Sequence, residues 1–320
     1  MPEATDSSPA VQIRDVRVDY GDNVAVDSIS LEIPPGEIFG LVGPNGAGKT
    51  STFKVLATLM EPTYGEVFLC GLDIAEKRER VRRLLGYMPD LAPVPSDLQV
   101  WEFLDLFASS HGLKRKARRT KIEEALVHVQ LTDRRHDPCK NLSRGMKQRL
   151  ALAKTMLHEP KVMLLDEPAS GMDPVSRAAL RRTLQALASR GTTVLVSSHI
   201  LTELSAMCTS VGIMSKGAVA ASGKIDEVLR KFSAQKVISV SLSGAVSVAR
   251  EIFEAHPQIS EVNLDGTTLS GRFEGDDQAQ VALLATLVDR GCLVRTFSEK
   301  TRDIESIILD LDNPTTDPPL

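Results

Sequence analysis

Residues Gly43 to Thr50 have the types and spacing needed to hold a phosphate group. They match the pattern G-x-x-x-x-G-K-[S/T], whose glycines let successive backbone N–H groups turn toward one anion. Lys49 adds a cation for the β- and γ-phosphates, and the Thr50 hydroxyl is suited to ligate Mg²⁺. We expect the nucleotide contacts here to be Gly43, Pro44, Asn45, Gly46, Ala47, Gly48, Lys49, Thr50 and Ser51.

A second group of reactive residues follows the apolar run Val162 to Leu165. Asp166 and Glu167 come directly after it, so a buried parallel strand would deliver both acids at its C-terminal end. Asp166 is expected to hold Mg²⁺, directly or through water, and Glu167 to polarise the water that attacks the γ-phosphate. An apolar run and two acids are a weak signal alone. Together with the phosphate loop they predict a site for ATP hydrolysis.

The segments beside these residues predict the elements that position them. Glu37 to Val42 is typical of a short buried strand and Ser51 to Met60 of a helix, which is the strand–loop–helix context the phosphate loop requires. A further strand, Thr192 to Ser198, leads into His199. A lone histidine is more often structural than catalytic, but its place at a strand end, after the acidic pair, favours a γ-phosphate contact.

Together with four further segments, these motifs resemble the nucleotide-binding domain of ATP-binding cassette (ABC) ATPases. Asn141 to Arg149 is similar to the signature segment of that family, Ser170 to Asp173 to its D-loop, and Leu85 to Asp90 to its Q-loop. Tyr20 stands where an aromatic residue stacks on adenine. The resemblance covers about residues 10–232. The R-G-M form of the signature and the C-terminal extension resemble the ATPase subunits of ABC-2 type exporters.

The resemblance implies a site shared between two copies of the cassette. Ser143 and Gly145 stand at the start of a helix-compatible run, an arrangement that forms an anion site. The phosphate loop of the same chain needs no second anion site. In the family two cassettes pack head to tail, and each signature meets the ATP held by the other copy. Ser143, Gly145 and Asp173 are therefore expected at the nucleotide of a partner copy.

Two segments depart from the family pattern. Asp90 stands where the Q-loop glutamine is usual. A carboxylate can still ligate Mg²⁺, so we include Asp90 with Thr50 and Asp166 as a metal ligand; the alternative is a surface loop acid. In the signature, Arg144 replaces the first of two glycines and Met146 a glutamine. Arg144 either adds a cation near the partner's γ-phosphate or faces solvent at a helix start.

Composition is typical of an enzyme of a reducing compartment. The 320 residues suffice for two domains, and the net charge of −4 implies no attraction to nucleic acid. The four cysteines lack C-x-x-C spacing and are expected to be buried apolar residues. Residues 1–10 do not resemble a signal peptide, and no apolar run approaches the about 18 to 20 residues that span a bilayer. A role in transport would therefore need a separate membrane protein.

Periodicity predicts two domains. The first, 10–232, is expected to be α/β, with an antiparallel part (strands 10–19 and 29–33), a doubly wound parallel core and a helical insertion (99–112 and 114–130) before the signature. Residues 1–9 are expected to be flexible. Residues 236–311 are predicted to have the β-α-β-β-α-β order of a ferredoxin-like domain, with a hairpin at Asp265-Gly266 and a last helix at 301–311. Residues 312–320 are expected to form a disordered tail. This second domain is interpreted as regulatory or dimer-stabilising.

The expected function is that of the ATP- and Mg²⁺-dependent subunit of an ABC-2 type exporter, peripheral on the cytoplasmic face of the membrane beside a separate permease. The alternative is a soluble ABC ATPase of repair or translation. Repair ATPases carry coiled coils or zinc modules between phosphate loop and signature, and translation-associated ones carry two cassettes. This chain has a compact span and one phosphate loop. A non-catalytic binding module is a third possibility, which Asp90 slightly favours. The cargo is not encoded in the chain.

Overall fold

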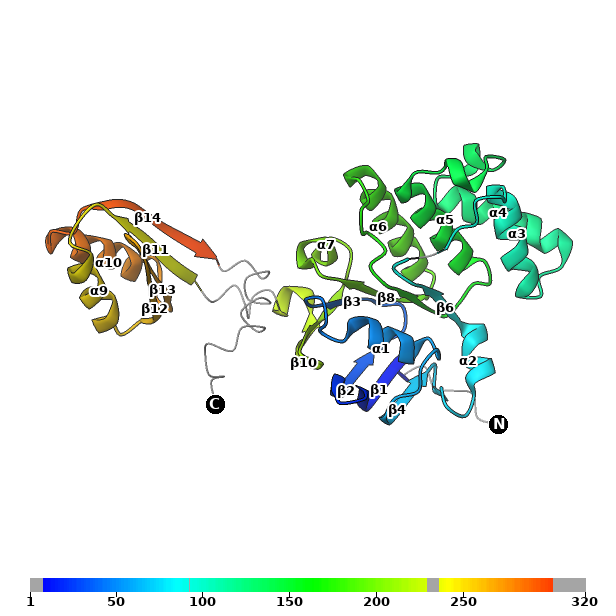
Figure 1. Ribbon diagram of the computed structural model, residues 1–320, viewed down its shortest axis with the longest axis horizontal. Coiled ribbons are helices and arrows are strands. Elements are labelled where there is room, and N and C mark those ends of the chain that lie inside the picture. The colour runs from blue at the N-terminus through cyan, green and yellow to red at the C-terminus, as the bar shows by residue number, and fades with distance from the viewer. Residues whose placement is uncertain (1–7, 92, 229–235, 302–320) are drawn as a thin grey trace. The chain divides into compact units, whose positions relative to one another are not determined.

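The computed structural model describes residues 8–91, 93–228 and 236–301. The chain divides into two compact units, of which the first ends at Ile225 and the second begins at Asp226 (Figure 1). The stretch 233–235 between the two expected domains, residues 1–7 of the N-terminus expected to be flexible, and the tail expected at 312–320 lie outside the described residues. Most of the predicted last helix does so too. Its first residue, Thr301, instead ends a strand that pairs with Lys236.

A six-stranded sheet forms the centre of the first unit, in the order β10–β9–β3–β8–β7–β6. All neighbours are parallel except β10, which runs antiparallel to β9. Every residue of β3, β7, β8 and β9 is buried, as in sheets covered on both faces. The carboxyl ends of β3, β7 and β8 therefore meet at one edge, as predicted. The strands are β3 (Ile38–Val42), β6 (Leu85–Met88), β7 (Val162–Leu165), β8 (Thr193–Ser198), β9 (Ser210–Ser215) and β10 (Ala218–Lys224).

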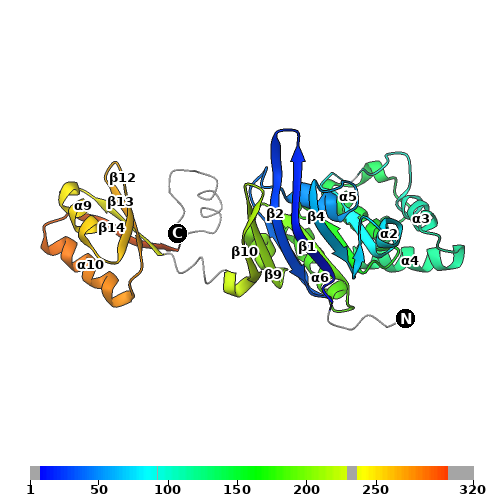
Figure 2. The same ribbon diagram turned by 90° about the horizontal axis from the view of Figure 1, so that it is seen from below.

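A second, antiparallel sheet has the order β2–β1–β4–β5, and its strands are seen from below in Figure 2. β2 begins well before the predicted Ile29, because Tyr20 pairs with Asn23 across a two-residue turn in which Gly21 has φ 60°. Helix α1 (Lys49–Leu56) packs between the two sheets, and Phe53 and Leu56 are fully buried there. The strands are β1 (Val11–Tyr20), β2 (Asn23–Ile33), β4 (Tyr64–Leu69) and β5 (Leu72–Asp73).

Helix α1 is shorter than predicted. It ends at Leu56 rather than Met60, because Thr58 adopts a left-handed φ of 58°. The N–H groups of Thr58 and Leu59 then bond to the carbonyls of Val55 and Lys54, which closes the helix end. The first turn of α1, which carries the functional residues, is unaffected.

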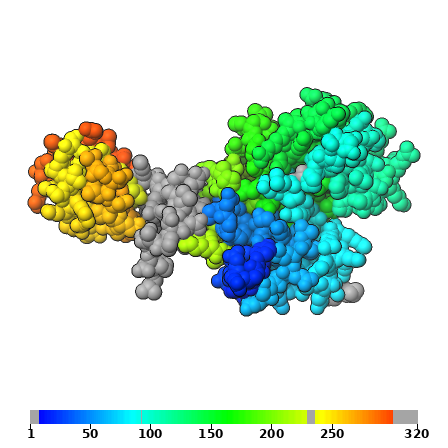
Figure 3. All heavy atoms as spheres, viewed as in Figure 1, coloured from blue at the N-terminus to red at the C-terminus, as the bar shows by residue number. Residues whose placement is uncertain are grey.

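The helical insertion contains the predicted helices within about two residues. They are α3 (Val100–Ser110), α4 (Arg115–His128) and α5 (Arg144–Met156), after the short α2 (Arg78–Leu84). A reciprocal capping box between Gln99 and Glu102 starts α3. The insertion is shown in cyan and green in Figure 3. Helices α6 (Pro174–Ala188) and α7 (Leu201–Ser205) pack on β3 and β8. Among the described helices, none is long and apolar enough to cross a membrane.

The second unit has the predicted β-α-β-β-α-β order. Its sheet is antiparallel throughout, in the order β12–β13–β11–β14, which is the split β-α-β arrangement of ferredoxin-like folds. Phe253, Phe273 and Leu287 are fully buried in its core. The elements are β11 (Lys236–Leu242), α9 (Val246–Ala255), β12 (Ile259–Asp265), β13 (Thr268–Phe273), α10 (Asp277–Asp289) and β14 (Val294–Thr301).

Three of the four cysteines are buried, as expected. Cys70 is exposed, and the expectation was wrong there. It lies in the tight turn between β4 and β5, with a left-handed φ of 50°.

Candidate ATPase site

The phosphate loop connects β3 to α1 and folds around the side chain of Lys49. Lys49 Nζ donates to the carbonyl oxygens of Gly43 (2.6 Å) and Pro44 (3.0 Å), and only 6% of the residue is exposed. Burial lowers the pKa of Lys49, while the charges of Glu167 and Asp166 act in the opposite direction. The loop therefore presents a desolvated ammonium group beside the N-terminus of a helix, a combination that attracts an anion.

Two glycines allow the loop to close this tightly. Gly48 precedes α1 with φ 102°, and a Cβ there would lie 2.4 Å from the carbonyl oxygen of Ala25. A Cβ at Gly43 would lie 2.2 Å from the carbonyl oxygen of Met214. Because Gly48 has no side chain, no side-chain cap bonds the start of α1. The first N–H groups of the helix are thus left for a bound anion.

An open cavity of about 360 Å³ lies over the loop. Tyr20 at its rim is 46% exposed, and the Tyr20 hydroxyl lies 3.3 Å from Ser51 Oγ. Its ring is thus accessible, and adenine stacking stays a prediction. Asn23, Val24 and Ala25 also line the cavity but were not predicted. The two-residue turn after Tyr20 reverses the chain and places them beside the phosphate loop. The predicted residues that line the cavity are Tyr20, Asn45, Gly46, Gly48, Lys49, Thr50, Ser51, Asp90 and Glu167.

Asp166 and Glu167 follow β7, and Ser197 of the neighbouring strand β8 forms a hydrogen bond with each of them. Asp166 is only 2% exposed, and its Oδ1 accepts a hydrogen bond from Ser197 Oγ at 2.6 Å. The same Oγ accepts the backbone N–H of Glu167 at 2.9 Å. Ser197 was not among the predicted site residues. The available signal was a hydroxyl in an apolar, buried strand, where a polar group needs a partner.

The Glu167 side chain joins two other predicted residues. Its Oε2 lies 3.0 Å from His199 Nδ1, and its Oε1 lies 4.0 Å from Lys49 Nζ. An ionised carboxylate can only accept a hydrogen bond, so Nδ1 of His199 carries the hydrogen. The structure therefore brings the strand-end histidine, the acid and the loop lysine together at one edge of the sheet.

Asp90 follows β6 and lines the same cavity. Its backbone oxygen accepts a hydrogen bond from Gln148 Nε2 at 3.2 Å, which ties this loop to α5. Burial raises the pKa of Tyr87 to about 12, and the nearby charges of Asp166 and Asp90 act in the same direction. Both carboxylates therefore lie near the Tyr87 phenol.

The signature and D-loop residues lie together, but outside this cavity. Ser143 Oγ accepts the N–H of Met146 at 3.3 Å and caps α5. Asp173 caps α6: its Oδ1 accepts the N–H groups of Val175 and Ser176, and its Oδ2 the Ser176 hydroxyl at 2.7 Å. That hydroxyl bond is the main reason why the pKa of Asp173 is lowered. A Cβ on Gly145 would lie 3.6 Å from Ser176 Oγ, so the two helix starts are neighbours.

Arg144 lies against the D-loop of its own chain. Its Nη2 donates to Ser170 Oγ at 3.3 Å. A Cβ on Gly171 would lie 2.8 Å from Arg144 Cζ, so the guanidinium packs directly on that glycine. Neither alternative from the sequence included this contact, which joins signature to D-loop.

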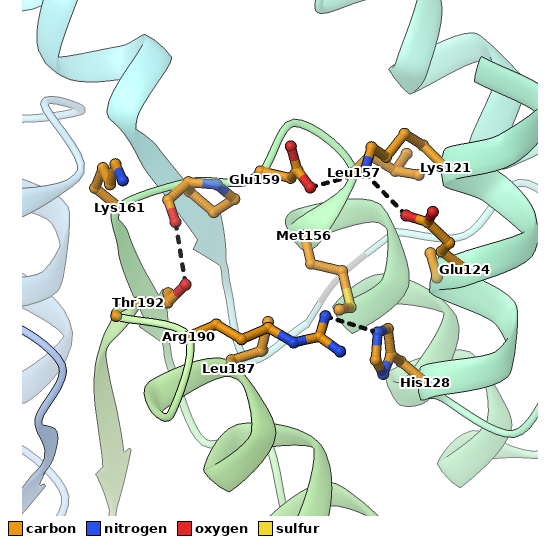
Figure 4. A pocket seen from close by; sticks show the side chains of 13 residues that line it. Lys121, Glu124, His128, Met156, Leu157, Glu159, Lys161, Leu187, Arg190 and Thr192 are labelled. Carbon is orange, nitrogen blue, oxygen red and sulfur yellow. Dashed lines mark hydrogen bonds and ion pairs between the residues drawn. The ribbon is translucent and has the colours of Figure 1, made fainter. Parts of the chain in front are cut away.

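A separate cavity of about 270 Å³ lies where α4, α5 and α6 end (Figure 4). Arg190 reaches across it to His128, with Nη1 3.3 Å from Nε2. Lys121 pairs with Glu124 at 2.9 Å and with Glu159 at 2.7 Å. None of the predicted site residues lines this cavity. Its contacts join the helical insertion to the core.

The oxygen groups near the phosphate loop suit Mg²⁺. Within the described residues there is no cluster of three or more His, Cys, Asp or Glu that would form a complete metal cage. Mg²⁺ is usually held by one or two carboxylates together with substrate phosphates. The buried Asp166 carboxylate and the cavity-lining Thr50 and Asp90 fit that form of binding.

Comparisons with known proteins agree with this geometry. Residues 26–170 match the ABC transporter family. The chain is 35% identical over 219 residues to Nod factor export ATP-binding protein I of Cupriavidus metallidurans, covering 68% of this chain and 72% of that protein. It is 34% identical over 226 residues to the probable multidrug ABC transporter ATP-binding protein YbhF of Escherichia coli, covering 71% of this chain and 39% of that protein.

Among solved structures, an ATP-binding subunit of an ABC transporter is 30% identical, with a TM-score of 0.64, covering 70% of this chain and 93% of that chain. The solved structure, the sequence relatives and the geometry of the phosphate loop all indicate the same kind of ATP-binding cassette. The chain therefore belongs to the ABC transporter family, as one of its ATP-binding, ATP-hydrolysing cassettes.

Proposed function

We propose that this chain is the ATPase subunit of an ABC-2 type exporter, working with a separate membrane permease at the cytoplasmic face of the membrane. The names of the two relatives, one for Nod factor export and one for multidrug transport, support an export role. The R-G-M signature and the C-terminal extension support the ABC-2 type. The cargo stays open, because the two names refer to different cargoes.

The convergence of Lys49, Glu167 and His199 carries the catalytic part of this proposal. Lys49 Nζ, which lies 4.0 Å from Glu167 Oε1, is the cation proposed to bind the phosphates. His199 Nδ1 holds Oε2, so Oε1 is the oxygen that orients the attacking water and accepts its proton. Thr50, Asp166 and Asp90 would hold Mg²⁺, which when bound neutralises charge on the phosphates.

The site is completed by a second copy of the cassette. Ser143 and Gly145 lie outside the cavity of their own phosphate loop, although a helix start is suited to an anion. Head-to-tail pairing would place them at the partner's γ-phosphate. The second unit is proposed to regulate the cassette or to stabilise that pair.

A groove beside the site is suited to contact with the permease. It has a volume of about 460 Å³, and Leu91 at its edge is 81% exposed. It lies between the Asp90 loop and the start of α5. A partner bound there would contact residues beside the nucleotide cavity and residues of the signature at the same time. The groove is lined by Asp90, Leu91, Pro93, Arg144, Lys147 and Gln148.

Co-purification with a permease tests this proposal. A tagged chain would be co-expressed with the membrane protein encoded beside it, and the ATPase rate and the bound membrane protein would be measured. We expect Leu91→Asp to lose the membrane protein while ATP hydrolysis in solution is retained. Val288→Asp, an equally drastic change on the exposed side of α10, should lose neither. Hydrolysis without any bound membrane protein in the wild type would contradict the exporter role and leave the ATPase assignment standing.

A further inference from the structure

Ser197 links the two acids of the site through one hydroxyl group. It lies next to the end of β8, is fully buried, and comes from the strand beside β7. Ser197 Oγ donates to Asp166 Oδ1 at 2.6 Å and accepts the Glu167 N–H at 2.9 Å. One side chain therefore touches both residues of the acidic pair.

We propose that Ser197 is a positioning residue of the ATPase site. Its hydroxyl sets the distance and orientation between Asp166, the metal ligand, and Glu167, the base. Ser197 touches neither the phosphates nor the water and acts through these two neighbours. The proposal rests on the ATPase chemistry of the cassette and is independent of the exporter role.

The direction of the hydrogen bonds follows from the groups involved. A backbone N–H can only donate and an ionised carboxylate can only accept, so the hydroxyl hydrogen must point at Asp166. This bond occupies Oδ1 of Asp166. The other oxygen, Oδ2, is the one we assign to a metal ion or its water.

The backbone of Glu167 needs such support. Its φ of 48° lies in the left-handed region, which a non-glycine residue keeps only when its surroundings hold it there. Ser197 holds the N–H of Glu167, and the N–H of Ser170 holds its carbonyl at 3.1 Å. This fixed backbone sends the Glu167 side chain toward His199 and Lys49. Without the hydroxyl, the Asp166–Glu167 peptide would be able to rotate and move the metal ligand and the base together.

A purely structural role makes a different prediction. If Ser197 only satisfies buried hydrogen bonds, its removal lowers the melting temperature and leaves the metal response of the remaining folded protein unchanged. If it positions Asp166, its removal weakens the contribution of Mg²⁺ to ATP binding. ATP affinity measured in EDTA, without Mg²⁺, depends on the phosphate loop. Comparing it with the affinity in Mg²⁺ therefore distinguishes the structural role from the positioning role.

The experiment compares Ser197→Ala, Ser197→Cys and Ser197→Thr with the wild type. The measurements are ATP affinity with Mg²⁺ and with EDTA, kcat, and melting temperature. We expect Ser197→Ala to lower kcat by about 10- to 100-fold and to shrink the Mg²⁺-dependent gain in ATP affinity, as loss of a hydrogen bond to a charged group does. Its affinity in EDTA should stay near that of the wild type. Ser197→Cys keeps the size but donates poorly and should behave like Ser197→Ala, whereas Ser197→Thr keeps the hydroxyl and should recover most of both properties.

Thr155→Ala is the matched control. The Thr155 hydroxyl is also buried, and it donates to the carbonyl of Ala151 within α5 at 2.9 Å. We expect this variant to lose melting temperature only. If Ser197→Ala and Ser197→Cys keep the wild-type gain in ATP affinity from Mg²⁺, the positioning role is wrong. The affinity measurement needs no turnover, so an inactive wild type would count against the ATPase function and still leave this comparison decisive.

Discussion

His199 and Glu167 form a hydrogen-bonded pair across the ends of β8 and β7, with Nδ1 of the histidine 3.0 Å from Oε2 of the acid. The two residues come from neighbouring parallel strands, so the pairing follows from sheet order. The histidine holds one carboxylate oxygen, and the other faces Lys49 at 4.0 Å. The acid is therefore oriented from both sides before any nucleotide arrives.

Glu167→Gln tests the role of that oriented carboxylate. The amide keeps the size of the side chain but cannot accept a proton from water, so turnover should fall by at least about 100-fold while ATP still binds. The variant should also trap the ATP-bound pair of cassettes, which size-exclusion chromatography with ATP would detect. Glu159→Gln, an equivalent change in the separate cavity, should leave turnover unchanged. Turnover of Glu167→Gln near the wild-type rate would contradict the assignment.

Lys49→Ala tests the phosphate loop. The lysine is the buried cation of the loop, so its loss should weaken ATP binding by about 10- to 100-fold, the usual effect of losing a charged hydrogen bond. A fluorescence titration with an ATP analogue measures the affinity. Lys161→Ala removes an exposed lysine from the separate cavity and should not change it. An unchanged affinity in Lys49→Ala would count against the phosphate-binding role.

Sequence order predicted the active edge of the sheet well. Each motif follows an apolar run, and the carboxyl ends of buried parallel strands share one edge, so Lys49, Glu167 and His199 had to meet. The Ser197 hydroxyl in an apolar strand indicated that it needs a partner, but its partners could not be named from the sequence, because they lie 31 and 30 positions away and are set by the register of β7 on β8. Arg144 is similar: its D-loop contact depends on how the starts of α5 and α6 pack.

Ser143→Arg tests the shared site. The Ser143 side chain faces no part of its own phosphate-loop cavity, so ATP binding by one copy should be intact. The large cation should block the position where the partner's γ-phosphate enters and so prevent ATP-driven pairing. The change is best made in the Glu167→Gln background, where the pair is long-lived, and followed by light scattering with and without ATP.

The matched variant in that background is Lys140→Glu, a drastic change in the turn before the signature. It should still pair. Normal pairing of the Ser143→Arg, Glu167→Gln protein would show that the signature does not face the nucleotide of the partner.

Asp90 is the site residue that departs most from the family pattern, and metal dependence decides its role. It lines the cavity with Thr50, and its charge reaches Tyr87 beside that of Asp166. If Asp90 is a metal ligand, Asp90→Ala should raise the Mg²⁺ concentration needed for half-maximal ATPase, because one oxygen donor is lost. Asp90→Gln keeps an oxygen donor and should largely preserve activity. Asp97→Ala changes a nearby loop acid outside the cavity and should alter neither quantity. If Asp90→Ala leaves both the metal requirement and the rate as in the wild type, Asp90 is a surface acid of the loop, and the metal ligands reduce to Thr50 and Asp166.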